Sequence, residues 1–204
     1  MARHRPLARK KLPVDTESLA RYLIGKLVVR ELPEGIVSGR VVETEAYIVG
    51  DAAGHAYRGM TPRNRALFLE PGHAYVYLAY GLSFMLNVSS EAPGIGAGAL
   101  IRALEPLEGI AIMANNRGTE RLRDLARGPG RLAQALRIDR SLDGLDLCEE
   151  GPLWLARDDH GPGEIGKREI GESVRIGISR DADRVLRFYV RDSPFVSGAK
   201  SLNG

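Results

Sequence analysis

The chain has 204 residues, 44% of them hydrophobic and 27% charged, which is ordinary for one globular domain with a substantial core. Cys148 is the only cysteine, which excludes an internal disulfide and points to a reducing compartment. The longest apolar runs fall far short of the ~20 residues of a membrane helix, and no apolar stretch follows the basic N-terminus as in a signal peptide. We therefore predict a soluble intracellular protein.

The net charge is only +3, but basic and acidic residues are unevenly distributed. Residues 1–11 hold five Lys or Arg and no acid, residues 117–140 hold seven arginines, and residues 142–172 are rich in Asp and Glu. One interpretation is a surface that faces an anionic polymer, and the other is a solvated helix face with a frayed tail. Charge alone leaves both open. We expect residues 1–11 to be a flexible basic tail and residues 12–204 to be a single domain.

The first half of the chain shows signals for one helix and then for strands. Asp15 is a suitable N-cap for a helix over the segment TESLARYLIG, which ends at Gly25. Apolar and β-branched residues predict strands at 26–32, 36–47, 73–79, 82–90 and 98–104. The third and fourth of these form a hairpin with its tip at Tyr80-Gly81.

The second half mixes helices with short strands. Helices are predicted at 106–116 and 128–138, the latter beginning with a Gly-Pro pair that suits a helix N-terminus. Short strands are expected at 151–157, 173–179 and 185–190. No repeat or long linker divides the chain. We therefore expect one α+β domain with a curved, mainly antiparallel sheet, flanking helices and a protruding β-hairpin.

The stretch VVETEAY at residues 41–47 is unusual for a core strand. Side chains alternate along a strand, so Glu43, Glu45 and Tyr47 share one face, and two carboxylates on a plain core face would be costly. This face of the strand is therefore either exposed to solvent or part of a functional site. Carboxylates two residues apart lie ~6–7 Å from each other, close to the separation of an inverting glycosidase pair. A sugar-cleaving enzyme is a legitimate hypothesis from this stretch.

Other kinds of site are absent from the sequence. The histidines at positions 4, 55, 73 and 160 are scattered, and Cys148 has no partner at ligand spacing, so we expect no metal site. No phosphate-cradling loop and no nucleophile elbow is present, which argues against nucleotide hydrolysis and serine hydrolase chemistry.

Aromatic residues cluster near a basic loop. Tyr47, Tyr75, Tyr77 and Tyr80 are four of the seven tyrosines, and the segment YRGMTPRNR precedes the last three. Aromatics beside arginines suit a pocket that stacks a nucleic-acid base. The alternative is that strand tyrosines are simply half-buried.

Seven segments together resemble the alkyladenine (3-methyladenine) DNA glycosylase family: VVETEAY, TPRNR, PGHAYVYLAYG, MLNVSS, LIRALEPLEG, LAQAL and FYVRDSPFVS. They run in the family's order from about residue 12 to residue 198. The resemblance implies an enzyme that flips alkylated or deaminated purines (3-methyladenine, hypoxanthine, ethenoadenine) out of duplex DNA. It would then hydrolyse the N-glycosidic bond and leave an abasic site.

The resemblance also implies roles for single residues. Glu45 matches the general base, for which an ordinary glutamate pKa is sufficient at pH 7. Arg102 and the backbone carbonyl of Val196 match the groups that hold the attacking water. The pocket walls match Tyr47, His55 and Tyr77, and Asn87 matches the residue that crowds the purine 2-position. Without the resemblance, His55 would be a loop histidine bonded to backbone, and Arg102 a surface arginine at a strand end.

Contacts with DNA follow in the same way. Tyr80 matches the residue that wedges into the minor groove, and Thr61 and Arg63 of TPRNR are expected to bind DNA. Ser83 stands where a second aromatic follows the wedge in the family, and Glu43 is expected to be structural, paired with an arginine. We expect a cofactor-free monomer acting on double-stranded DNA, cytoplasmic and nucleoid-associated in a bacterium or nuclear in a eukaryote. A non-catalytic damage-binding protein and the sugar hydrolase remain as alternatives.

Overall fold

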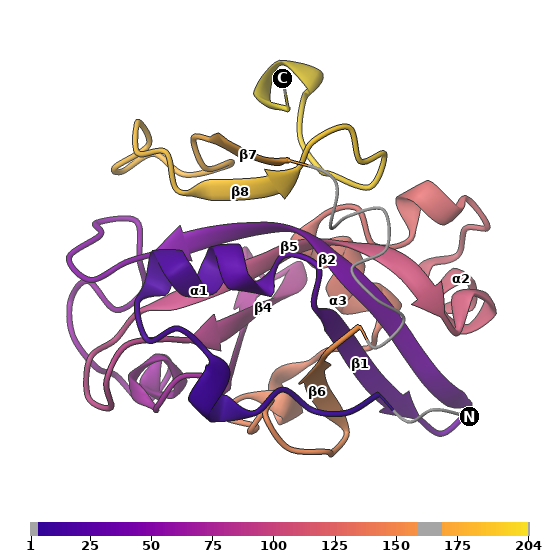
Figure 1. The fold of residues 1–204 in the computed structure, drawn as a ribbon, viewed down its shortest axis with the longest axis horizontal. Coiled ribbons are helices and arrows are strands. Elements are labelled where there is room, and N and C mark those ends of the chain that lie inside the picture. Colours follow the sequence, from indigo (N-terminus) through magenta and orange to yellow (C-terminus); the bar gives the residue numbers. More distant parts are fainter. Residues whose placement is uncertain (1–3, 159–168, 204) are drawn as a thin grey trace.

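A computed structural model of the chain describes residues 4–158 and 169–203, and the segment 159–168 lies outside the described part. Its centre is a curled sheet in which every strand pair is antiparallel (Figure 1). The strands are β1 (Leu27–Leu32), β2 (Gly35–Tyr47), β3 (Ala74–Ala79), β4 (Ser83–Ser89), β5 (Gly98–Glu108), β6 (Leu153–Ala156), β7 (Ile170–Ser173) and β8 (Arg187–Val190). Six of them follow the order β3-β4-β5-β2-β1-β6, while β8 pairs with β2 and β7 with β8. The expected α+β domain with a curved antiparallel sheet is confirmed.

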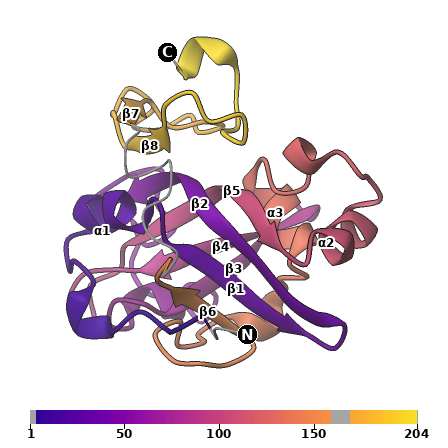
Figure 2. The same cartoon turned by 45° about the vertical axis from the view of Figure 1, so that its right-hand side comes forward.

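In the described part of the chain, three α-helices flank the sheet: α1 (Thr16–Leu23), α2 (Ile110–Arg117) and α3 (Pro129–Ala135). Both views place α1 toward one side of the molecule and α2 toward the other, with the β7–β8 hairpin above β2 (Figure 2). Asp15 caps α1 by accepting the backbone N–H of Ser18 at 2.8 Å, a contact typically worth about 1 kcal/mol. Within the described ranges, every helix is too short or too polar to cross a bilayer.

The long strand β2 organises the sheet. One edge pairs with β5, whereas the other edge pairs first with β1, at residues 35–40, and then with β8, at residues 43–45. The register against β5 shifts on either side of Glu43. Such bulges bend a strand and re-aim its side chains, and they are common next to active sites. The change of partner therefore occurs where the two glutamates lie.

Two predicted elements differ from the structure. Strand β5 continues through Pro106 to Glu108 because it pairs with the first half of β2, so the helix expected at 106–116 begins only at Ile110, after Gly109 (φ 69°). The strand expected at 173–179 is wrong beyond Ser173. The following residues leave the sheet because Arg175 and the Ile176 N–H bind carboxylates elsewhere.

The expected flexible tail at residues 1–11 is wrong from residue 4 onward. Leu7 is 1% exposed, and its N–H donates to the Leu155 carbonyl at 2.9 Å. The guanidinium of Arg9 forms an ion pair with Asp146. A buried leucine and a paired arginine fix this segment, and neither contact could be read from the local charge.

Candidate active site

The middle of β2 carries two carboxylates that are fully buried. Glu43 and Glu45 are both 0% exposed, in the segment where β8 replaces β1 as the partner. They lie on one face of the strand, because both contact the guanidinium of Arg102. On the other face, the Thr44 hydroxyl donates to the Ala20 carbonyl of α1 at 2.9 Å. Buried carboxylates need partners, and those of the two glutamates differ.

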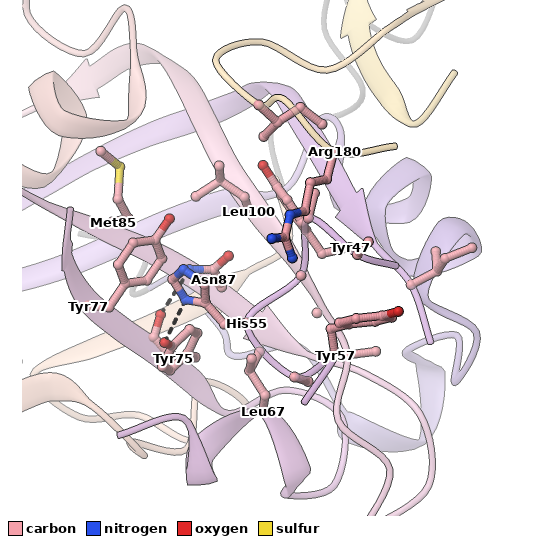
Figure 3. Close-up of a pocket in the computed structure, with 18 of the residues that line it drawn as sticks. Tyr47, His55, Tyr57, Leu67, Tyr75, Tyr77, Met85, Asn87, Leu100 and Arg180 are labelled. Carbon is pink, nitrogen blue, oxygen red and sulfur yellow. Dashed lines mark hydrogen bonds between the residues drawn. The ribbon is translucent and has the colours of Figure 1, made fainter. Parts of the chain in front are cut away.

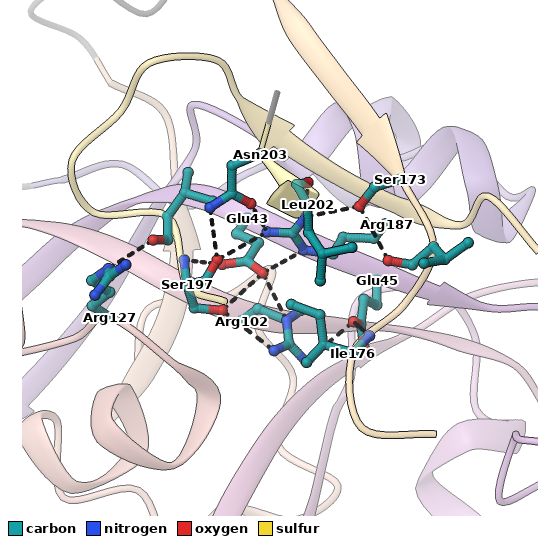
Figure 4. A network of polar contacts seen from close by, with 12 residues as sticks. Glu43, Glu45, Arg102, Arg127, Ser173, Ile176, Arg187, Ser197, Leu202 and Asn203 are labelled. Atoms are coloured by element: carbon teal, nitrogen blue, oxygen red, sulfur yellow. Dashed lines mark hydrogen bonds and ion pairs between the residues drawn. The ribbon is translucent and has the colours of Figure 1, made fainter. Parts of the chain in front are cut away.

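Glu43 is saturated with donors (Figure 4). Its Oε1 accepts from Nε of Arg102 at 2.8 Å, Nε of Arg187 at 2.7 Å and the Ser197 hydroxyl at 2.9 Å, and Oε2 accepts the Ser197 N–H at 2.7 Å. Burial favours the neutral acid, but the two guanidiniums outweigh it and lower the pKa of Glu43. The expected pairing of Glu43 with arginine is confirmed.

Glu45 has fewer charged partners. Its Oε1 accepts the Ile176 N–H at 2.7 Å and lies 3.2 Å from Nη1 of Arg102, and Oε2 accepts the Tyr47 hydroxyl at 3.0 Å. Burial raises the pKa of Glu45, although Arg102 and the hydrogen bonds oppose the shift. Two neighbouring carboxyl groups therefore have pKa values shifted in opposite directions, a pattern typical of residues with separate roles.

A cavity of about 590 Å³ lies in front of Glu45. Its lining includes Tyr47, Arg102 and Ile176, the three residues that bind the Glu45 carboxylate. Glu45 itself is not among the described lining residues, so its carboxylate sits one layer behind the wall. The volume is within the range of small-molecule sites. The cavity therefore has room for a flat heterocycle within reach of a buried, titratable acid.

Aromatic rings form the sides of this cavity. Figure 3 shows Tyr47 on one side and Tyr77 and His55 on the other. The rings of His55 and Tyr77 meet edge-on with centroids 4.4 Å apart, and Tyr75 stacks behind Tyr77 at 5.4 Å. His55 Nδ1 is hydrogen-bonded to the Tyr75 hydroxyl at 2.9 Å, so the alternative of a backbone-bonded histidine is wrong. Burial, reinforced by Arg63, lowers the pKa of His55 and favours a neutral ring.

Two polar residues complete the interior. Asn87 of β4 lines the cavity and donates Nδ2–H to the Tyr75 carbonyl at 3.2 Å. Arg102 of β5 is only 6% exposed, so the alternative of a surface arginine is wrong. Within the described ranges, no three His, Cys, Asp or Glu side chains gather as a metal-ligand set.

Val196 lies beside this network rather than in the cavity lining. It is 3% exposed and precedes Ser197, which binds Glu43. Its carbonyl accepts a hydrogen bond from Nε of Arg127 at 2.7 Å. A carbonyl oxygen has a second lone pair, so this bond leaves one acceptor site on Val196.

The hairpin tip presents an aromatic ring to solvent. Tyr80 is 90% exposed and Leu82 is 85% exposed. Tyr80 (φ 52°) and Gly81 (φ 70°) are the central residues of a turn closed by the Leu82 N–H and the Ala79 carbonyl at 2.9 Å. A tyrosine in the left-handed region costs of order 1–3 kcal/mol, which is typical of functional positions. The expected tip at Tyr80-Gly81 is confirmed.

Thr61 and Arg63 belong to a loop held beside this hairpin. The Thr61 N–H donates to Oδ1 of Asn64 at 2.6 Å, and Asn64 in turn donates Nδ2–H to the His55 carbonyl at 2.8 Å. Arg63 reaches the Leu78 carbonyl of β3 at 3.4 Å. The loop therefore connects the cavity wall to the exposed tip.

Several contributors were missed in the sequence. The loop after β7 supplies Ile176, Ile178 and Arg180 to the cavity, and Ile176 acts through its backbone N–H, for which no side-chain signal exists. The buried Arg175–Asp51 pair supports this loop, with Nη2 of Arg175 donating to Oδ1 of Asp51 at 3.0 Å and the guanidinium 4.7 Å from the Tyr47 ring centroid. The one sequence feature that indicates this pair is the position of Arg175 within an otherwise apolar stretch.

With its buried glutamate behind an aromatic cavity and its exposed aromatic hairpin tip, the protein belongs to the class of DNA glycosylases, as its family match shows. The chain belongs to the methylpurine-DNA glycosylase family, whose family model matches residues 10–194. It is a hydrolase that acts on N-glycosyl bonds and serves DNA base excision repair.

Related proteins share most of its length. A protein of Mesorhizobium japonicum is 76% identical over 98% of this chain and 93% of its own length, and one of Paraburkholderia phytofirmans is 52% identical over 97% and 90%. An archaeal relative from Methanoculleus marisnigri is 45% identical over 90% and 94%. Each bears the name "Putative 3-methyladenine DNA glycosylase".

Proposed function

We propose that the protein excises damaged purines of the 3-methyladenine, hypoxanthine and ethenoadenine class from double-stranded DNA. It does so as a monofunctional, cofactor-free monomer, with a water molecule activated by Glu45, and leaves an abasic site. The observation that carries this proposal is the position of Glu45, directly behind an aromatic cavity and held by three residues of the cavity wall.

Base recognition requires that the nucleotide leave the helical stack, because the reacting bond is inaccessible inside a duplex. The flipped purine stacks between Tyr47 on one side and Tyr77 with His55 on the other. Asn87 crowds the 2-position and disfavours guanine, which carries an amino group there. Tyr80 fills the gap left in the duplex, while Thr61 and Arg63 bind the DNA beside it. Insertion of an aromatic ring offsets part of the few kcal/mol that unstacking costs.

In the chemical step, water attacks the anomeric carbon and Glu45 accepts its proton. The carbon–nitrogen bond breaks, the base leaves with the electron pair and, where it is not already a cation, takes up a proton from solvent, and the new carbon–oxygen bond completes the abasic sugar. Arg102 and the free lone pair of the Val196 carbonyl hold the water. The Tyr47 hydroxyl and the Ile176 N–H support this assignment, because both fix the orientation of the Glu45 carboxylate.

The sugar-hydrolase alternative needs Glu43 as a proton donor. Arg102 and Arg187 bind that carboxylate and lower its pKa, so Glu43 is a poor general acid. A non-catalytic damage reader has no use for a titratable Glu45 behind its pocket. Both alternatives are therefore disfavoured.

The decisive experiment is incubation with a duplex that contains one hypoxanthine, followed by alkali. We expect strand cleavage at the lesion after alkali only. A binding protein would retain the duplex without any cleavable site, and a sugar hydrolase would leave it untouched. Either result, obtained also with 3-methyladenine and ethenoadenine in place of hypoxanthine, would overturn the proposal.

A further inference from the structure

A second cavity, of about 470 Å³, lies next to the candidate active site. Met85 and Pro129 line both cavities, so the two share a wall. Figure 3 shows Met85 beside Tyr77, at the edge of the first cavity. Three arginines line the second cavity, Arg117, Arg127 and Arg131, and we call this site the arginine cleft.

The arginine cleft concentrates positive charge. No Asp or Glu is among its described lining residues. Arg131 has one carboxylate partner, Asp124, at 3.2 Å. Arg127 donates from Nε to the Val196 carbonyl at 2.7 Å, and Arg117 donates from Nε to the Leu125 carbonyl at 3.1 Å and from Nη1 to Oε1 of Gln134. Each guanidinium carries five N–H donors, so these contacts leave several donors in every case.

The guanidinium of Arg117 is partly buried in the cleft. Burial lowers the pKa of Arg117; Arg131 adds to this shift and Asp124 opposes it. A bound anion would compensate the buried charge and accept the remaining N–H donors, preferably as an oxyanion that two donors of one guanidinium can hold.

Small residues line part of the arginine cleft and leave space in it. A Cβ at Gly130 would meet the Ser83 side chain at 2.8 Å, so the backbone of α3 approaches β4 closely. Ser83 stands where the family resemblance led us to expect a second aromatic after the wedge. A large ring on β4 here would point at the same backbone, and the serine leaves the space open.

On these grounds we propose that the arginine cleft binds a backbone phosphate of the lesion-carrying strand, next to the flipped nucleotide. This inference rests on the proposed function, because it takes the first cavity as the site of the base. A strand whose base enters that cavity continues past the shared wall of Met85 and Pro129 into the cleft. The cleft supplies through phosphate contacts some of the affinity that a second aromatic would supply through stacking.

The first test measures binding to an undamaged duplex over a series of salt concentrations. Each phosphate contact contributes about 0.9 to the slope of log K against log salt, so Arg131→Ala should reduce the slope by about 1 and weaken binding several-fold at low salt. Arg137→Ala is the matched control, because Arg137 is also a surface arginine paired with one carboxylate, Glu34 at 2.6 Å, and lines neither cavity. An Arg131→Ala slope equal to that of wild type would overturn the proposal.

The second test locates the phosphate. A duplex with a stable abasic-site analogue is made with a neutral methylphosphonate at one position at a time around the lesion. One position should weaken binding of wild type and Arg137→Ala by several-fold and leave Arg131→Ala insensitive. Equal sensitivity of all three proteins at every position would contradict the cleft assignment. Thermal melting of each variant identifies loss of folding.

The two proposals fail in different ways. If wild-type protein leaves no alkali-cleavable site at hypoxanthine, 3-methyladenine or ethenoadenine, the proposed function is wrong. If wild type excises the base while Arg131→Ala keeps the wild-type salt slope, only the cleft assignment is wrong.

Discussion

The carboxylates of Glu43 and Glu45 share one guanidinium: Arg102 reaches Glu43 through Nε at 2.8 Å and Glu45 through Nη1 at 3.2 Å. Arg187 adds a second positive charge on the Glu43 side only. The asymmetry lowers the pKa of Glu43, whereas burial raises that of Glu45. The two carboxylates therefore have different electrostatic environments, and we expect their substitution to separate activity from stability.

Exchange of Glu45 for Gln keeps the shape and removes the base. We expect excision of hypoxanthine to fall by ~10²-fold or more, while binding to lesion duplex survives. Glu43→Gln should instead lower the free energy of unfolding by roughly 3–5 kcal/mol, because it leaves the buried Arg187 without its counter-charge and Arg102 with Glu45 alone. Single-turnover excision and thermal melting measure the two effects. Equal losses of excision at matched folded fraction would show that the roles are wrongly assigned.

The rate of excision should depend on the ionisation of Glu45. Only the carboxylate accepts a proton from water, so the rate falls as pH decreases through the pKa of Glu45. Since burial raises that pKa, the fall should begin above the ordinary glutamate value of about 4.3. Single-turnover rates between about pH 4 and pH 8 give the profile. A wild-type rate that stays constant down to the ordinary value, or an acid limb that persists in Glu45→Gln, would argue against this assignment.

Removal of the exposed ring at the hairpin tip should affect flipping more than chemistry. Tyr80→Ala should weaken binding to a hypoxanthine duplex, whereas a single-stranded substrate, whose base is already unstacked, should lose much less. Leu78→Ala, a half-exposed strand residue of the same hairpin, is a suitable control. The wedge role is untenable if Tyr80→Ala loses equally on both substrates.

The buried Arg175–Asp51 pair should support catalysis from behind the cavity wall. Arg175→Lys keeps the charge but loses the paired N–H geometry and the contact with the Tyr47 ring. Because Ile176 is the next residue, its N–H to Glu45 should shift, and we expect excision to fall at least ~10-fold together with the melting temperature. Arg184→Lys, an exposed arginine 3.8 Å from Asp181, is the control. A lower melting temperature with an unchanged excision rate would restrict Arg175 to a structural role.

Water, rather than an amine, should attack the sugar. A glycosylase that also nicks the strand generally forms a Schiff base through an amine. Among the described lysines, Lys10, Lys11, Lys26 and Lys200, none lines the cavity, and Lys167 lies outside the described residues. We expect that borohydride traps no protein–DNA adduct during turnover and that EDTA leaves the rate unchanged. An adduct that disappears in a lysine variant, or a rate lost with EDTA and restored by a metal ion, would contradict this prediction.

Local patterns predicted the parts of the fold that depend on neighbouring residues. The capped helix after Asp15, the long strand through Glu45 and the hairpin with Tyr80 at its tip all follow from periodicity, caps and turn residues. The pairing of Glu43 with arginine was expected because a buried carboxylate needs a counter-charge.

Contacts between residues far apart in the chain determine the parts of the fold and of the site that local sequence patterns did not predict. The segment after Ser173 has the alternating pattern of a strand. It leaves the sheet because Arg175 binds Asp51 and the Ile176 N–H binds Glu45, residues that lie more than 120 positions earlier in the chain. The burial of Leu7 against β6 likewise depends on a partner far along the chain. The chain has many arginines, and Arg187 can be predicted as the partner of Glu43 only if the pairing of β8 with β2 is known. No local sequence signal encodes that pairing.

The attachment of Arg187 to late residues has a consequence for biosynthesis. Its guanidinium donates to the Leu202 carbonyl at 3.0 Å and to Oδ1 of Asn203 at 2.7 Å. Glu43 forms hydrogen bonds with both Arg187 and Ser197, which follow it late in the chain. A ribosome makes Glu43 more than 140 residues before these partners, which at ~5–20 residues per second is a delay of roughly seven to thirty seconds. During this interval Arg102, which follows Glu43 by 59 residues, is the available counter-charge of that carboxylate. A chain that ended before Arg187 would therefore contain the six strands ordered β3-β4-β5-β2-β1-β6 and part of the site, but it would lack one of the two guanidiniums that bind Glu43.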